Sequence, residues 1–223
     1  METLTGKINA EEFKSWLTRQ KTIRELFRWP IPFEDAKTML RIAYAREVEK
    51  RGMVCEPTEA VFGYLDKIAE IMTSKSTKCG ILLCGNCGNG KTTTMNAFHS
   101  VTQYVAPPGI DVECTSARRI SQIAKDEEMM RVAKRTKVLL IDDVGLEPTE
   151  VLDFGNAINP VIEILEHRYR QQLFTFITTN LTPRQIREKY GDRIADRFNE
   201  TMECIVYENP TFRRKYYDNR NKI

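Results

Sequence analysis

The stretch from Gly80 to Thr94 constrains the fold most strongly, because it joins an apolar strand, a glycine-rich loop and the start of a helix. Residues 85–92 fit the pattern G-x-x-x-x-G-K-[ST] at every fixed position. Glycines let the backbone curl, so that successive N–H groups face one point and can bind phosphate oxygens. A helix over residues 91–104 would add the positive end of its dipole. The stretch therefore predicts a nucleotide-binding loop within an α/β domain.

The loop residues have separate expected roles, and together they imply ATP and Mg²⁺ as cofactors. Lys91 would supply a point charge to the outer phosphates, and Thr92 would offer its hydroxyl to the magnesium ion. A glycine-rich turn that carries a lysine by chance is the alternative, and the strand before the loop and the helix after it argue against that alternative. The residues expected to contact the nucleotide are Gly85, Asn86, Cys87, Gly88, Asn89, Gly90, Lys91, Thr92 and Thr93.

The composition is ordinary for a globular protein, with 41% hydrophobic and 29% charged residues in a chain of 223. That length suits one α/β domain with a small accessory segment. No apolar run approaches the roughly 20 residues of a membrane span, and residues 1–10 lack a signal-peptide core. We therefore expect a cytoplasmic protein without membrane contact. The net charge of +3 does not by itself require a nucleic-acid partner.

The six cysteines are scattered along the chain, and we expect them to be reduced. Cys84 ends the strand and Cys87 lies inside the phosphate loop, so a disulfide between them would lock a loop that has to wrap phosphate. Their spacing also suits zinc. Because no second Cys or His pair follows at a finger-like distance, we reject a zinc site.

A second motif, Lys137 to Gly145, places two acids after four apolar residues. The apolar run predicts a buried parallel strand, and doubly wound sheets bind ligands at the carboxyl ends of such strands. Asp142 would hold the magnesium ion directly or through water, and Asp143 would orient or deprotonate the attacking water. The alternative is a simple strand-ending turn, which the phosphate loop upstream makes less attractive.

Two later segments add candidate polar groups. A strand over residues 173–180 would bring Asn180 to the same edge as Asp142, where a carboxamide can sense the outer phosphate; a turn and helix cap is the alternative. A helix after residue 191 puts Arg193 and Arg197 on one face. One of these arginines could reach the phosphate of a neighbouring subunit, or both could belong to a surface helix with many ion pairs.

The remaining periodic segments predict helices over residues 9–20, 33–51, 58–72, 116–124, 126–133, 160–170 and 183–190, a strand over 111–115, and an exposed loop over 146–156. The first helix carries Phe13 and Trp16, which could pack on the main domain or dock a partner. We expect a helical N-terminal segment over 1–54 and an ATPase domain over 55–223. The helices of 116–135 are basic, and their charges could form a solvated face or contact DNA phosphates; they are Arg118, Arg119, Lys125, Arg131, Lys134 and Arg135.

The order of these motifs resembles that of the AAA+ ATPases of the DnaC-like family, the bacterial helicase loaders and IstB transposition helpers. The resemblance covers residues 79–214 and rests on the phosphate loop, the Asp-Asp strand, the strand ending in Ile-Thr-Thr-Asn, and Gly-Asp-Arg-Ile-Ala-Asp-Arg-Phe. It implies an AAA+ P-loop NTPase core whose parallel sheet is flanked by helices. It also implies the residue roles: Lys91 and Thr92 as Walker A, Asp142 and Asp143 as Walker B, Asn180 as sensor 1, and Arg193 or Arg197 as the arginine finger.

The resemblance implies partners as well: single-stranded DNA at residues 116–135, a replicative helicase or transposase at the N-terminal segment through Phe13, Trp16 and Trp29, and assembly with further copies on ATP binding. We expect a helicase-loader-like ATPase of DNA replication. A transposition helper, or a nucleotide-dependent scaffold with little turnover, is the alternative.

Two features depart from the wider AAA+ pattern. Asp143 stands where most AAA+ proteins have Glu, which suggests slow or partner-stimulated hydrolysis. Few residues follow Arg197, so we expect little or no C-terminal lid, no sensor 2 arginine, and a last strand at 205–207. The basic, aromatic segment 212–217 could bind DNA or fold back onto the core.

Overall fold

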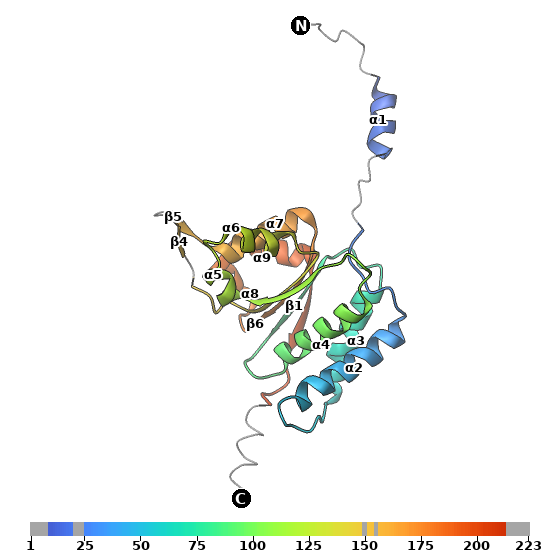
Figure 1. The fold of residues 1–223 in the computed structure, drawn as a ribbon, viewed down its shortest axis with the longest axis vertical. Coiled ribbons are helices and arrows are strands. Elements are labelled where there is room, and N and C mark those ends of the chain that lie inside the picture. The colour runs from blue at the N-terminus through green and yellow to red at the C-terminus, as the bar shows by residue number, and fades with distance from the viewer. Residues whose placement is uncertain (1–8, 20–24, 149–150, 154–155, 213–223) are drawn as a thin grey trace, which may run out of the picture.

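The fold is built on a parallel sheet of five strands, seen edge-on among its helices in Figure 1. The computed structural model describes residues 9–19, 25–148, 151–153 and 156–212. The strands stand in the order β2-β3-β6-β1-β7. Their bounds are β1 Gly80–Gly85, β2 Val112–Ser116, β3 Val138–Val144, β6 Phe174–Thr179 and β7 Met202–Tyr207. The prediction of an α/β fold with a parallel sheet flanked by helices is therefore confirmed.

The three central strands form because they are apolar along most of their length, as strands that are covered on both faces must be. Alternate residues serve opposite faces of the sheet. On β1, Ile81 and Leu83 enter one hydrophobic core, and Leu82 enters the other. On β6, Phe176 and Ile177 divide in the same way. Both cores therefore depend on the register of the same strands.

Helices cover each face of the sheet as a separate layer (Figure 1). The first layer holds α2 (Phe33–Glu49), α3 (Glu59–Thr73) and α4 (Lys91–Val105). The second layer holds α5 (Ala117–Gln122), α6 (Glu127–Arg135), α7 (Pro160–Gln171), α8 (Pro183–Tyr190) and α9 (Asp192–Thr201). Among the described residues, no helix combines the length and the apolar character that a membrane crossing needs.

The loop predicted over residues 146–156 is wrong in part, because the structure contains a small hairpin there. Strand β4 (Val151–Asp153) pairs antiparallel with β5 (Asn156–Ile158). Strands this short carry too few residues to show an alternating pattern, and pairing between strands is a property that neither segment has alone.

The N-terminal region divides between an exposed helix and a buried segment. In α1 (Ala10–Arg19) every residue is exposed, including Phe13 and Trp16, and Asn9 caps the helix by accepting from Glu11 N at 3.1 Å. Trp29 is different, since only 3% of it is exposed. The indole stacks on Phe98, with ring centroids 5.1 Å apart, and donates to Thr102 Oγ1 at 3.1 Å.

The prediction that Trp29 docks a partner is therefore wrong, because its side chain is buried in the hydrophobic core. Trp29, Leu40 of α2 and Phe98 of α4 all belong to one core, which crosses the expected domain boundary at residue 54. The docking role of Phe13 and Trp16 stays a prediction. Most of the basic segment 212–217 and any lid element in residues 213–223 lie outside the described residues.

Replacing Trp29 with Ala should lower the free energy of unfolding by ~3–5 kcal/mol, because the change removes a buried aromatic side chain and leaves Thr102 without its donor. Urea unfolding followed by circular dichroism would measure the loss. Trp16→Ala is the matched control, because Trp16 is 51% exposed and its removal should change stability by less than about 0.5 kcal/mol. Equal effects of the two changes would contradict the assignment of Trp29 to the core.

Candidate ATP site

The candidate site lies where the central strands end. Strand β1 runs directly into the phosphate loop, β3 carries Asp142 near its end, and β6 is followed by Asn180. The strands are parallel and in register, with Cys84 beside Thr179 and Val144 beside the same threonine. Parallel strands put their carboxyl ends at one edge, so the fold brings together three segments that are far apart in the sequence.

Glycine is required at two points of the phosphate loop. Gly85 has φ 149°, and a Cβ there would lie 2.5 Å from the carbonyl oxygen of Tyr207. Gly90 has φ 100° and stands as the N-cap of α4. The first backbone bond of α4 runs from Thr94 N to Gly90 O, so the N–H groups of residues 91–93 are the ones that a helix start offers to an anion. Thr93 is a buried residue, so its main-chain N–H, rather than its side chain, is the group that could bind phosphate.

The ammonium group of Lys91 lies at the centre of the site, and the residue is only 4% exposed. It donates to Gly85 O at 2.7 Å, to Asn86 O at 2.8 Å, to Asn89 Oδ1 at 3.1 Å and to Asn180 Oδ1 at 2.8 Å. The last contact joins the loop to the end of β6, as the proposed sensing role of Asn180 requires. A lysine held by neutral oxygens keeps its full charge available for a polyanion.

Burial lowers the pKa of Lys91, and nearby anionic groups act in the opposite direction. Among those groups Asp143 has a larger effect than Asp142. Triphosphate oxygens would stabilise the charged lysine further, so the donor set fits ATP.

Thr92 and Asp142 form the predicted magnesium pair. Thr92 Oγ1 donates to Asp142 Oδ1 at 3.1 Å. A second hydroxyl, that of Thr178 on β6, donates to the same carboxylate oxygen at 2.5 Å. Hydroxyl and carboxylate oxygens are the ligands that Mg²⁺ prefers, and a site that supplies one of each leaves the remaining positions to water and phosphate. The sequence analysis did not single out Thr178, although its place two residues before Asn180, at the end of an apolar strand, was the available signal.

Asp143 has a left-handed backbone with φ 54°, which is unusual for a residue other than glycine. Its N–H donates to Thr178 Oγ1 at 2.9 Å, and the register between β3 and β6 shifts between Ile141 and Val144. On a regular strand, Asp142 and Asp143 would point to opposite faces of the sheet. The left-handed backbone of Asp143 changes the relative directions of these two consecutive acids.

The segment that follows β7 contacts the outer side of the phosphate loop, which the sequence did not reveal. Asn209 Nδ2 donates to Asn89 O at 3.0 Å, and Phe212 N donates to Gly88 O at 2.9 Å. Asn89 Nδ2 in turn donates to Tyr207 O at 3.0 Å. The bonds from Asn209 and Phe212 occupy carbonyl groups of the loop, so they favour a loop whose N–H groups face the ligand. Asn86 and Cys87, at the tip of the loop, are exposed.

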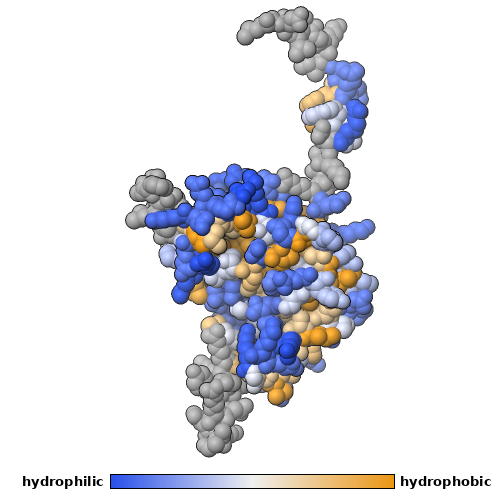
Figure 2. All heavy atoms as spheres, in the orientation of Figure 1, coloured by the Kyte–Doolittle hydropathy of each residue, from blue (hydrophilic) through white to orange (hydrophobic). Residues whose placement is uncertain are grey.

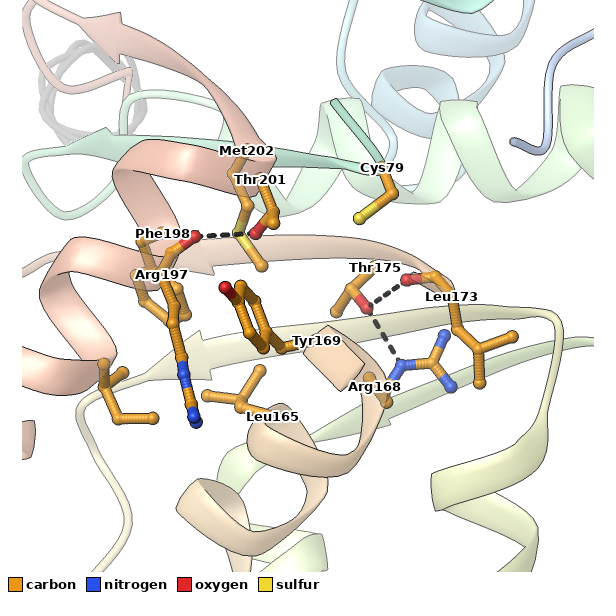
Figure 3. Close-up of a pocket in the computed structure, with 11 residues that line it drawn as sticks. Cys79, Leu165, Arg168, Tyr169, Leu173, Thr175, Arg197, Phe198, Thr201 and Met202 are labelled. Carbon is orange, nitrogen blue, oxygen red and sulfur yellow. Dashed lines mark hydrogen bonds between the residues drawn. The ribbon is translucent and has the colours of Figure 1, made fainter. Parts of the chain in front are cut away.

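Arg193 and Arg197 share one face of α9, as predicted, but their surroundings differ. Arg197 has a side chain only 14% exposed, donates to Glu166 Oε1 at 2.8 Å and lies over the ring of Tyr169. It lines a pocket between α7, α9 and the sheet, in which none of the phosphate-loop residues takes part (Figure 3). The side chain of Arg193 is 71% exposed and lies 3.4 Å from the same carboxylate. Arg193 is therefore the arginine that is better placed to meet another molecule.

The basic residues of 116–135 are exposed apart from Lys134, which is half-buried. Arg131 is paired with Glu128 and Lys134 with Glu163. For Arg118 and Arg135 the described part of the chain supplies no ion-pair partner. Helix α5 starts beside the ATP site, since Ser116 pairs in register with Asp142. Hydrophilic side chains gather at the end of the molecule that carries α5 and α6 (Figure 2).

Comparisons with known proteins agree with the fold. The chain is 28% identical over 137 residues to the replicative helicase loader DnaI of Bacillus subtilis (strain 168), a match that covers 57% of this chain and 43% of DnaI. No family model matches. The DnaC helicase loader has a similar fold, with a TM-score of 0.52 and 17% identity over 74% of this chain and 98% of that one.

The replication initiator DnaA, solved with AMPPCP and single-stranded DNA, also has a similar fold, with a TM-score of 0.52 and 20% identity over 79% of this chain and 55% of that one. At these identities the structures establish the fold. The predicted resemblance to DnaC-like AAA+ proteins is confirmed, and the chain matches less than half the length of DnaI.

Proposed function

We propose that this protein is a magnesium-dependent ATPase of the helicase-loader type, which engages single-stranded DNA and a replicative helicase. The observation that carries the proposal is the meeting of Lys91, Thr92 and Asp142 at one edge of the sheet. Groups that can bind phosphate and groups that can bind magnesium come together there from separate segments. The similarity to DnaI supports the helicase as client.

Thr92 and Asp142 would hold a magnesium ion, whose positive charge would offset the charge that develops as the terminal phosphoryl group leaves. Thr92 and Asp142 supply oxygens for the ion, and the N–H groups at the start of α4 bind the phosphates. Lys91 exchanges its carbonyl acceptors for phosphate oxygens and keeps Asn180 in reach of the terminal phosphate. Asp143 orients the attacking water or takes its proton. Its arm is shorter than that of Glu, which is consistent with slow or partner-stimulated turnover.

Assembly with further copies would allow Arg193 to act as the arginine finger. An exposed arginine on α9 can reach the nucleotide of a neighbouring subunit and stabilise charge in the transition state. Arg197 instead holds α9 against α7 through Glu166 and Tyr169. The basic residues of α5 and α6 would contact the DNA backbone next to the ATP site.

Lys91→Ala should reduce ATP affinity about a hundredfold or more, the equivalent of ~3 kcal/mol, because the site loses its central charge. Equilibrium titration with a fluorescent ATP analogue would measure the change. Lys37→Ala is the control, since within the described part of the chain Lys37 pairs with Glu34 and lies over the Phe33 ring, both on its own helix. Thermal unfolding of both variants separates a binding defect from misfolding, and unchanged affinity in a folded Lys91→Ala protein would refute the site.

The client is identified by capture with the wild-type chain and Lys91→Ala. The wild-type chain, offered a replicative helicase and a transposase, should retain the helicase when a non-hydrolysable ATP analogue is present, and Lys91→Ala should not. Retention of the transposase would point to a transposition helper. Nucleotide binding without measurable hydrolysis, with or without single-stranded DNA, would point to a scaffold.

Arg193→Ala should leave ATP affinity and stability nearly unchanged but reduce hydrolysis in the assembled state by ~10³. Arg197→Ala should instead lower the free energy of unfolding by about 1–3 kcal/mol, since it breaks a largely buried charged hydrogen bond. Steady-state hydrolysis and urea unfolding of both variants would test this division. Full activity of Arg193→Ala would remove the proposed contact between subunits.

A double change, Arg118→Ala with Arg119→Ala, should weaken binding of single-stranded DNA and flatten its dependence on salt. The log–log slope should fall by ~0.7 for each phosphate that the protein no longer neutralises. Fluorescence anisotropy at several salt concentrations would measure both quantities. Arg46→Ala with Arg51→Ala provides a control of equal charge in and just after α2, on the other helical layer. Identical slopes for the two double variants would count against α5.

A further inference from the structure

The turn that follows Asp143 is held by a cluster that the proposed ATPase chemistry has not used. Asp143 and Gly145 both have positive φ, 54° and 114°. The left-handed backbone is unfavourable for a residue other than glycine, so the turn persists only if its surroundings hold it. One bond within the turn, from Leu146 N to Asp143 O, measures 3.1 Å. Further support comes from the side chain of Glu147 and from helix α8.

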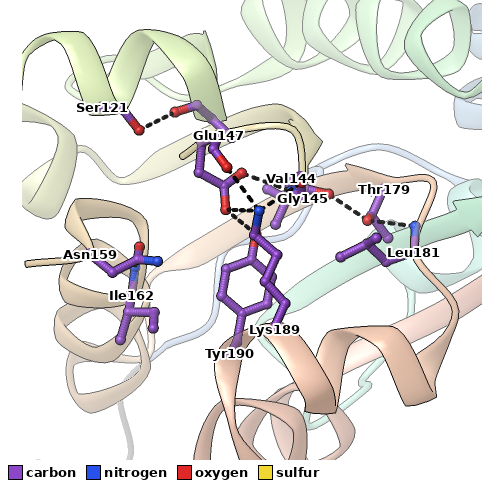
Figure 4. Close-up of polar contacts among 11 residues, drawn as sticks. Ser121, Val144, Gly145, Glu147, Asn159, Ile162, Thr179, Leu181, Lys189 and Tyr190 are labelled. Atoms are coloured by element: carbon purple, nitrogen blue, oxygen red, sulfur yellow. Dashed lines mark hydrogen bonds and ion pairs between the residues drawn. The ribbon is translucent and has the colours of Figure 1, made fainter. Parts of the chain in front are cut away.

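Glu147 is the centre of that support, and its side chain is 0% exposed. Its Oε2 accepts from Gly145 N at 2.8 Å, and its Oε1 accepts from the hydroxyl of Tyr190 (Figure 4). Lys189 Nζ lies 3.6 Å from the same Oε1. A carboxylate withdrawn from water in this way needs its donors, because an unpaired buried charge is strongly unfavourable.

Lys189 also binds the turn through two backbone carbonyls. Its ammonium group donates to Gly145 O and to Glu147 O, both at 2.8 Å. Figure 4 shows the lysine and Tyr190 reaching the turn side by side from the last turn of α8. Both the N–H and the carbonyl of Gly145 are therefore held by this cluster.

The same end of α8 sets the start of α9. Gly191, with φ 83°, joins the two helices, and Arg193 follows within the first turn of α9. Tyr190 is buried with Ile194 of α9 in one core. A displacement of α9 would therefore move Tyr190, and through Glu147 it would also move the turn that follows Asp143.

We infer that Glu147, together with Lys189 and Tyr190, positions Asp143 for hydrolysis and ties its orientation to helix α9. The inference rests on the proposed ATPase function. Glu147 is a positioning residue, because its hydrogen bonds run to the turn that carries the acid and to α8 rather than to Lys91, Thr92 or Asp142. A neighbouring subunit that contacts Arg193 could use the same connection to adjust hydrolysis.

Glu147→Gln tests the inference, with Tyr190→Phe as a milder second variant that removes a single donor. For Glu147→Gln we expect kcat to fall at least tenfold while ATP affinity stays within twofold. The fall for Tyr190→Phe should be smaller. Asp143→Asn combined with Glu147→Gln should hydrolyse no more slowly than Asp143→Asn alone, because both changes act on one group. Glu47→Gln is the matched control, because Glu47 is a buried glutamate of α2 that pairs with Lys50, the residue just after that helix.

Hydrogen exchange of the segment 143–148 gives a readout that does not need turnover. Glu147→Gln should speed exchange there at least severalfold and leave the protection of the phosphate loop by ATP unchanged. Parallel losses of kcat, ATP affinity and thermal stability, a multiplicative loss in the double variant, or unchanged exchange would each overturn the inference. If the wild-type protein binds ATP without hydrolysing it, the ATPase proposal fails, and the exchange experiment still decides the role of Glu147.

Discussion

The hydrogen bonds of the Lys91 ammonium group are the interaction on which the site depends. A buried cation requires acceptors, and here they come from the phosphate loop and from Asn180 at the end of β6. The loop and the neighbouring strand end are therefore joined through one group. Replacement of these acceptors by phosphate oxygens would change the restraint on both segments at once, which offers a direct physical route from nucleotide state to shape.

The second helical layer also contains a buried cation that is held by several acceptors, and its contacts are structural. Arg168 of α7 is 1% exposed and donates to Ala133 O, Thr136 O and Phe174 O, and also to Thr175 Oγ1. Burial lowers its pKa, and the acceptors offset the cost of removing the charge from water. The residue ties the end of the basic helix α6 to the start of β6. That helix is thus fixed to a strand that leads to the ATP site.

Segments that come late in the chain support both the phosphate loop and the turn after Asp143. Asn209 and the N–H of Phe212 hold carbonyls of the loop, and Lys189 and Tyr190 hold the turn after Asp143. Groups that face the nucleotide would carry the chemistry, while these supports restrict the directions in which those groups can point. Pre-organisation of this kind is what makes hydrogen bonds effective at a reacting phosphate.

The sequence alone predicted the parallel sheet, the phosphate loop and the position of Asp142 and Asn180 after strands, because each depends on local pattern: apolar runs that end in polar residues, and glycines at fixed spacing. Only the tertiary structure decided the fate of Trp29, the difference between Arg193 and Arg197, and the β4–β5 hairpin. It alone also revealed the supports built by Glu147, Arg168 and Asn209. Burial and pairing depend on which distant segment packs against a residue, and spacing along the chain carries no information about that distance.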